Sequence, residues 1–334
     1  MNSQITLKGL LMSIPTHSRR QLLKTGLALG AIASSSFGFA KQATAEDKTL
    51  RIGYQKFGTF ALLKARGTLD KAVEPLGAKV TWTEFPAGPQ LLEALNAGVI
   101  DFGTTGEAPP IFAQAAGAPL AYIGHEPAAP KGEAILVPKG SPIKSVADLK
   151  GKKIALNKGS NVHYFLVKAL EKAGVAYADI QPAFLVPADA RAAFEKGAVD
   201  AWVIWDPFFA AAEASLSPTI LADGEGLVDN IEFFLANKNY TVANPNVVAA
   251  LLKNLTELDN WATANQDAAA DLLATSIGQP KEVLKTVLTR HGFGVQPVGD
   301  DIIAKQQKIA DTFLALGLIP KAIKVSDAQW KTPV

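Results

Sequence analysis

The pattern of hydrophobic and polar positions along most of the chain predicts an α/β protein. Short runs such as Lys79–Phe85 and Glu133–Val137 are alternating or wholly apolar, as strands are. They alternate with segments whose apolar residues recur at three- and four-residue spacing, as in helices. This order predicts mainly parallel sheets with right-handed crossovers. After Pro245 the pattern is helical.

One helix–glycine–strand unit occurs twice, about a hundred residues apart. The two copies are Leu91–Pro109 and Ala190–Pro207, and their alignment matches Gly98 with Gly197, Asp101 with Asp200 and Glu107 with Asp206. Turns favour Gly and Asp, so two unrelated corners could share them. The match also runs through the strand, however, which favours a true repeat. We therefore expect two similar α/β lobes that face each other across a cleft, with ligands at the carboxyl ends of the strands.

The lobe boundaries are expected where the chain crosses between the two sheets. Residues 127–131 are rich in Pro, Ala and Lys, and 231–237 form a predicted strand that returns to the first lobe. We expect residues 46–131 and 232–334 to form lobe 1, and residues 132–231 to form lobe 2. Two crossings would act as a hinge in this periplasmic-binding-protein-like type II fold.

The first 45 residues are expected to be a twin-arginine signal peptide and not part of the fold. Ser18-Arg19-Arg20 precedes a weakly apolar run, which ends at an Ala-Thr-Ala cleavage site, residues 43–45. The apolar run is too short and too rich in small residues for a membrane span. The formal net charge is +2 for the whole chain, and 28 basic against 31 acidic side chains, a net −3, remain after this segment. We expect a soluble periplasmic protein without a lipid anchor and without a nucleic-acid partner.

Three loops are candidate anion sites because each leads from a predicted strand into a helix through Gly, Ser or Thr. A helix N-terminus offers unpaired N–H groups and a partial positive charge, so it can hold an anion without a cation. Thr59 and Ser160 could instead simply cap their own helices. The loops contain Gly58, Thr59, Thr104, Thr105, Gly106, Gly159, Ser160 and Asn161.

Two acidic residues and a tryptophan adjoin these loops. Glu107 and Asp206 would repel an anion, so each either pairs with a cation such as Lys56, Lys158 or Arg191, or accepts an N–H from the ligand. Asp206 could also form an Asx-type turn before its proline. Trp205 alternates with Trp202 on one strand, so we expect Trp202 in the core and Trp205 beside the ligand's tail.

Several kinds of chemistry find no support in the sequence. The chain has no cysteine, and its four histidines are scattered without metal-ligand spacing. His163, near the Ser160 loop, is expected on the surface. There is no phosphate-binding P-loop and no G-x-S-x-G nucleophile motif. We therefore expect no metal, no cofactor and no catalytic residues.

The chain resembles the periplasmic aliphatic-sulfonate-binding proteins of ABC importers, in the nitrate/sulfonate/taurine group. The phrases that carry the resemblance include LRIGYQK, FGTTGEAPPIFAQAAGA and PADARAAFEKGAVDAWVIWDPF, and they span nearly the whole mature chain. The resemblance implies a monomer that closes on a small sulfonate and delivers it to membrane permease subunits served by separate ATPase subunits. It implies ligand contacts from Gln55, Gly58, Thr59, Thr104, Thr105, Gly106, Glu107, Gly159, Ser160, Asn161, Trp205 and Asp206. Glu107 departs from the pattern, in which an aspartate is expected.

Three alternatives remain open from the sequence. The ligand could be taurine, nitrate or another small oxyanion. The protein could also be an enzyme on the same scaffold, although the desulfinases of this fold use a cysteine that is absent here. Finally, it could present its ligand to a signalling partner.

Overall fold

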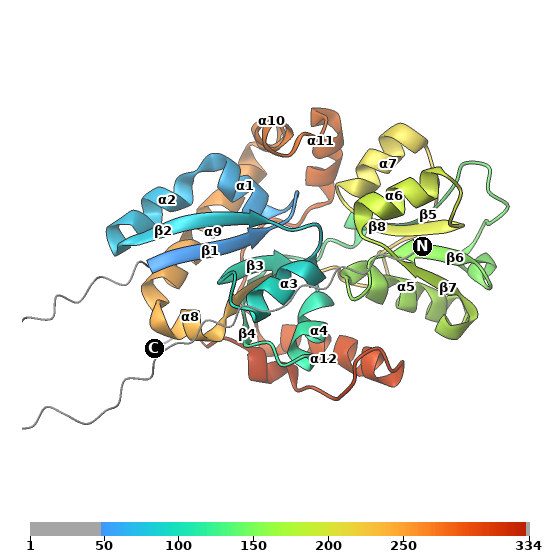
Figure 1. The fold of residues 1–334 in the computed structure, drawn as a ribbon. Coiled ribbons are helices and arrows are strands. Elements are labelled where there is room, and N and C mark those ends of the chain that lie inside the picture. The colour runs from blue at the N-terminus through green and yellow to red at the C-terminus, as the bar shows by residue number, and fades with distance from the viewer. Residues whose placement is uncertain (1–47, 332–334) are drawn as a thin grey trace, which may run out of the picture. The chain divides into compact units, whose positions relative to one another are not determined.

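The computed structural model describes residues 48–331, which form a two-domain α/β structure built on two five-stranded sheets. All the described residues belong to one compact unit. The twin-arginine segment lies outside the described residues. Figure 1 shows the strands of the two sheets as two separate groups, each flanked by helices.

The first sheet has the order β2-β1-β3-β10-β4. Its strands are β1 (Lys48–Tyr54), β2 (Ala78–Glu84), β3 (Phe102–Thr105), β4 (Leu120–His125) and β10 (Phe233–Asn237). Its helices are α1 (Thr59–Arg66), α2 (Thr68–Val73), α3 (Gly88–Asn96), α4 (Pro109–Ala115), α8 (Lys238–Ala243), α9 (Pro245–Ala264), α10 (Gln266–Ile277), α11 (Lys281–Arg290) and α12 (Asp300–Ala315).

The second sheet has the order β7-β6-β8-β5-β9. Its strands are β5 (Glu133–Val137), β6 (Lys153–Leu156), β7 (Gln181–Phe184), β8 (Ala201–Trp205) and β9 (Thr219–Asp223), with helices α5 (Asn161–Lys172), α6 (Pro187–Glu195) and α7 (Phe208–Leu216). A short 3₁₀ helix, Val146–Leu149, lies between β5 and β6.

Each sheet is mainly parallel but contains one antiparallel strand. β10 runs antiparallel to β3 and β4, and β5 runs antiparallel to β8 and β9. These are the strands on which the chain arrives from the other sheet. They begin at the cleft, where the other strands end, so their direction is reversed.

The helical C-terminal region covers both faces of the first sheet. Side chains of α9 and α10 pack with α1 and β1 in one core cluster, and α12 packs with α3 and α4 in another. α9 runs without a break from Pro245 to Ala264, within the region that the sequence pattern predicted as helical. α11 reaches further and packs against α7 of the second sheet through Val283, Val287, Ala210 and Ala211.

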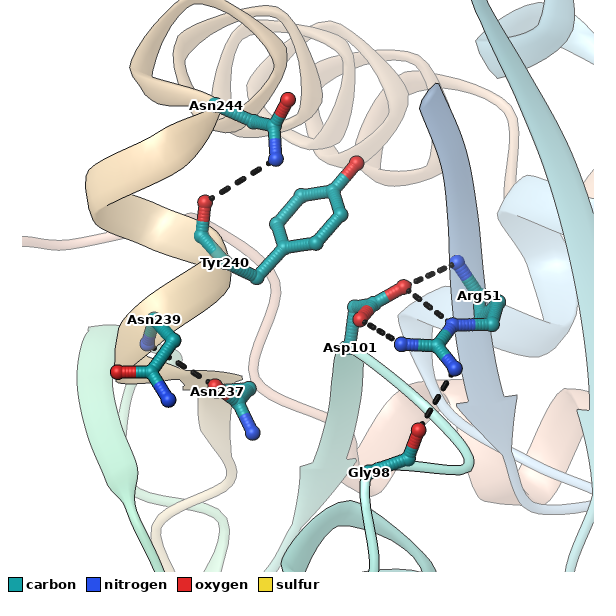
Figure 2. A network of polar contacts seen from close by, with 7 residues as sticks. All are labelled: Arg51, Gly98, Asp101, Asn237, Asn239, Tyr240 and Asn244. Atoms are coloured by element: carbon teal, nitrogen blue, oxygen red, sulfur yellow. Dashed lines mark hydrogen bonds and ion pairs between the residues drawn. The ribbon is translucent and has the colours of Figure 1, made fainter. Parts of the chain in front are cut away.

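The predicted repeat is present as the same local structure in both sheets. Gly98 and Gly197 have φ angles of 69° and 66°, which suit glycine. Asp101 Oδ2 accepts the backbone N–H of Arg51 at 2.9 Å, and Asp200 Oδ2 accepts that of Lys153 at 2.7 Å. In the first copy the Arg51 guanidinium also donates to Asp101 and to the Gly98 carbonyl (Figure 2). Each unit therefore fixes where its strand begins, and so where the loop after it lies.

Candidate functional site

A cavity of about 70 Å³ lies between the two sheets at the ends of their parallel strands. A water molecule needs about 10–15 Å³ on this measure, so the cavity holds only a few water-sized groups. Six of the predicted site residues line it: Gln55, Gly106, Ser160, Asn161, Trp205 and Asp206. The other six are not among the residues that line it: Gly58, Thr59, Thr104, Thr105, Glu107 and Gly159.

The cavity has a helix end, formed by Gly88, Gly106, Pro109, Ser160 and Asn161. Gly88 is the first residue of α3, and Ser160 precedes α5. A Cβ atom on Gly106 would lie 2.8 Å from Cβ of Asn161, so the two sheets contact each other here only because residue 106 is glycine. The His163 N–H donates to the Ser160 carbonyl at 3.0 Å, and the N–H groups of Asn161 and Val162, which precede it in α5, have no carbonyl partner among residues 48–331.

The hydroxyl groups at these loops are already engaged. Ser160 Oγ donates to the Asn157 carbonyl at 2.7 Å, and Thr105 Oγ1 donates to the Gly106 carbonyl at 3.0 Å. Thr59 donates to Glu126. Neither Thr59 nor Ser160 caps its helix through its side chain, so the capping alternative is wrong for both. The donors that remain at the helix end are chiefly backbone N–H groups.

Another part of the cavity, its charged end, contains Arg290, which no local sequence pattern marks. Its guanidinium donates to Glu213 at 2.7 Å and lies 3.5 Å from Asp206 Oδ1, while Nη1 lacks a hydrogen-bond partner among the described residues. The expected cations contact other residues: Lys56 pairs with Glu84, Arg191 pairs with Glu195, and Lys158 lies over the ring of Phe184. That expectation was wrong because Arg290 is distant in sequence and reaches the cavity from the end of α11.

A buried histidine completes the charged end. His291 Nε2 lies 3.2 Å from Glu126 Oε2, a distance for an ion pair, although the atoms are not aligned for a hydrogen bond. Burial lowers the pKa of His291, but Glu126, Glu232 and Asp259 raise it above its ordinary value. Burial, with the charge of Glu126, raises the pKa of Glu232 to about 8. Thr104 Oγ1 donates to Glu232 at 2.9 Å, so Thr104 supports this end from behind.

Asp206 and Trp205 lie where β8 leads into α7. Asp206 Oδ1 accepts the N–H of Ala210 at 3.0 Å, so the side chain does bond the backbone of the following turn, and Oδ2 has no described partner. Burial raises the pKa of Asp206 to about 6. Trp202 is fully buried, which confirms its predicted place in the core. Trp205 is half-buried and lines the cavity, and its contact with a ligand's tail stays a prediction.

Glu107 is buried outside the cavity. Its Oε2 accepts the N–H of Ile231 at 3.2 Å, and burial raises its pKa to about 7. The cation whose charge acts on it is Lys305, and not one of the three lysine and arginine residues expected from the sequence.

His163 is wholly buried, so its expected surface position was wrong. Its Nδ1 accepts the N–H of Gly159 at 3.2 Å, and its Nε2 lies 2.8 Å from the Tyr177 hydroxyl. Burial lowers its pKa to about 4, and the neutral ring therefore holds the Gly159 loop in place.

Within residues 48–331, no group of three or more His, Asp or Glu side chains could hold a metal ion. Of the helices in that range, none is long and apolar enough to span a membrane.

Comparison with known proteins places this architecture in a family. The NMT1/THI5-like family matches residues 77–269. An Escherichia coli (strain K12) protein named as aliphatic sulfonates-binding is 44% identical over 314 residues, which are 93% of this chain and 97% of that one. The chain belongs to the NMT1/THI5-like family, among the aliphatic-sulfonate-binding proteins.

Two solved structures agree with this membership. The alkanesulfonate-binding protein SsuA of Xanthomonas axonopodis pv. citri, bound to MOPS, superposes with a TM-score of 0.82 at 45% identity, covering 86% of this chain and 99% of that one. The periplasmic aliphatic sulphonate binding protein SsuA of Escherichia coli gives a TM-score of 0.78 at 45% identity, covering 86% and 93%. These relatives are binding proteins.

Proposed function

We propose that this protein captures aliphatic sulfonates in the periplasm and delivers them to the permease of an ABC importer for sulfur acquisition. The observation that carries the proposal is a cavity between two sheets whose one end is built from helix N-termini and glycine. Sulfonates stay ionised and carry no acidic proton. A wall of N–H donors without an obligatory acceptor therefore suits them.

In this proposal the sulfonate headgroup binds at the helix end of the cavity, against the N-terminus of α5 and Gly106. Ser160 and Asn161 contribute from the second sheet, and Gln55 lies on the wall from the first. The tail then points toward Trp205, which is half-buried and has room for an apolar contact. In this proposal the six other expected residues do not touch the ligand but hold the loops that do. They are Thr104, Thr105, Thr59, Gly58, Gly159 and Glu107.

Closure of two lobes on the ligand is part of the proposal. We assign residues 46–131 and 232–334 to one lobe and residues 132–231 to the other. The sheets support this assignment, because β1 to β4 and β10 form one sheet and β5 to β9 form the other. Because the cavity has only about 70 Å³, a longer alkyl chain needs the walls to move apart.

The remaining parts of the proposal concern export and partners. We infer export by the twin-arginine route, a monomeric binding protein without enzymatic activity, and docking on permease subunits with separate ATPases. The twin-arginine sequence and the binding-protein relatives support these inferences.

Isothermal titration with butanesulfonate, taurine, nitrate and phosphate tests the function. We expect butanesulfonate to bind most tightly. Equal or tighter binding of phosphate would contradict the sulfonate assignment.

A further inference from the structure

Two buried carboxyl groups lie directly behind the helix end of the cavity, one from each sheet. Glu107 follows β3 and is 3% exposed, and Glu133 opens β5 and is 0% exposed. Glu107 Oε2 accepts the N–H of Ile231 at 3.2 Å, and Glu133 Oε2 accepts the Asn161 side-chain amide at 2.7 Å. The Oε1 atoms of both have no hydrogen-bond partner among residues 48–331.

The charged groups around the pair leave it without a dedicated cation. Lys305 of α12 pairs with Asp229 at 2.8 Å, so its charge is shared with a nearer carboxylate. Asp229 itself disfavours ionisation of Glu107. Tyr164 of α5 remains neutral, since burial raises its pKa to about 12. Glu133 meets the neutral amide of Asn161 and the charge of Glu107.

Two negative charges are therefore unfavourable at this place. Burial raises the pKa of Glu107 to about 7, and burial together with the charge of Glu107 raises the pKa of Glu133 well above its ordinary value. Neighbouring carboxyls in a poorly solvated site retain a proton because they cannot both ionise cheaply.

The pair is in contact with the cavity through one residue. Asn161 is the first residue of α5, lines the cavity, and donates its amide both to Glu133 and to Asn230 at 3.0 Å. An ionised Glu133 would place a negative charge next to the N-terminus of α5. That charge would cancel the partial positive charge which makes the helix end suitable for an anion.

We propose that Glu107 and Glu133 form a proton-holding pair that must retain a proton for the cavity to accept an anion. Where the free protein has lost this proton, anion binding takes one up from solvent, while the anion itself stays unprotonated. The inference rests on the proposed function, in that a sulfonate is the anion at the helix end.

Titration of butanesulfonate between about pH 5 and pH 9, in two buffers of different ionisation enthalpy, tests the proposal. We expect a constant Kd at low pH. At pH values above the pKa at which the pair loses its proton, Kd should increase by about tenfold per pH unit. Binding should then take up about one proton per ligand. Glu133→Gln and Glu107→Gln should each bind at neutral pH and lose most of this slope.

The control is Glu225→Gln, which alters an exposed carboxylate paired with Lys131 and should keep the wild-type slope. Glu232→Gln tests whether the pH dependence comes from the charged end of the cavity and not from the pair. A slope that persists in both pair variants and disappears in Glu232→Gln overturns the proposal, and so does a Kd independent of pH in the wild type.

A spectroscopic measurement keeps the inference separate from the proposed function. The infrared spectrum of the ligand-free protein at neutral pH should contain a protonated-carboxyl band that is reduced in either pair variant. If wild-type protein binds no sulfonate at any pH but this band is present and is reduced in either pair variant, the proposed function fails and the pair still holds its proton. Because Glu232 also retains a proton at neutral pH, the reduction in a pair variant carries the assignment, and Glu107→Gln supplies it where Glu133→Gln does not fold. A band that is absent in the wild type, or that keeps its full intensity in the pair variants, overturns the pair.

Discussion

Arg290, the last residue of α11, donates a hydrogen bond of 2.7 Å to Glu213 of α7, and thereby ties a helix that packs on the first sheet to a helix of the second. The same guanidinium lies over the ring of Phe209, 4.3 Å from its centroid, and lines the cavity. A single side chain therefore lines the cavity and also links helices that pack on the two sheets. Loss of this side chain should affect closure as well as binding.

We predict that Arg290→Ala weakens butanesulfonate binding by about 2 kcal/mol, because it removes the link between α11 and α7 that supports closure and leaves Asp206 buried without its cation. Glu213→Gln is the matched variant, because it removes the ion pair and leaves the guanidinium in the cavity. It should cost about 1 kcal/mol, since Glu213 is partly exposed. Titration calorimetry measures both, and equal affinities for wild type and Arg290→Ala would refute the role of this contact.

Gly106→Ala should reduce affinity strongly, because the added Cβ would meet the Asn161 side chain at 2.8 Å and separate the loops at the helix end. Asn161→Gly should weaken binding by itself by removing the amide. The informative comparison is the double variant. If the clash is the cause, Gly106→Ala has little further effect when residue 161 is glycine, whereas additive losses would point to another cause.

Trp205→Ala should change the dependence of affinity on chain length. If the alkyl tail packs on this ring, each added methylene of an alkanesulfonate gains up to about 0.8 kcal/mol in the wild type. The variant should bind methanesulfonate nearly as well and lose most of that increment for longer chains. If affinity rises with chain length by the same amount in the wild type and in the variant, the tail does not pack on Trp205.

The stability of the ligand-free protein should fall as pH rises from about 5 to about 8. Burial raises the pKa of Glu232 to about 8 and that of Glu107 to about 7, so both are protonated in the fold at low pH. A carboxyl whose pKa is raised on folding contributes its full stability below its unfolded pKa and loses it as pH rises through the folded value.

Glu232→Gln should reduce this pH dependence. The loss in free energy of unfolding between about pH 5 and about pH 8 should be smaller than in the wild type by roughly 1–3 kcal/mol. Urea unfolding of both proteins at each pH measures the effect. An unchanged pH dependence in the variant would show that Glu232 does not retain its proton in the fold.

Much of the fold could be predicted because its signals are local. The repeated Gly–Asp pattern indicated the strand starts, and in the structure Asp101 and Asp200 do accept equivalent N–H groups. Trp202 and Trp205 were separated by strand alternation alone. The antiparallel strands β5 and β10 could not be deduced from the same periodicity, because a chain arriving from the other sheet has the same pattern as any buried strand.

The site was only partly predictable for a related reason. Loops that follow strands could be recognised, and Ser160, Asn161 and Asp206 do line the cavity. Arg290 and His291 come from a helix end more than eighty residues after Asp206, where no local pattern marks them. Which hydroxyls are already bonded, as Thr59 is to Glu126, depends on tertiary contacts that spacing does not reveal.

A crystal structure with butanesulfonate tests the central claim most directly. The account predicts the sulfonate oxygens within hydrogen-bond distance of the first N–H groups of α5 and beside Gly106, with the alkyl chain toward Trp205. A sulfonate bound to one sheet alone, or held in another cavity with the helix end filled only by water, would contradict it.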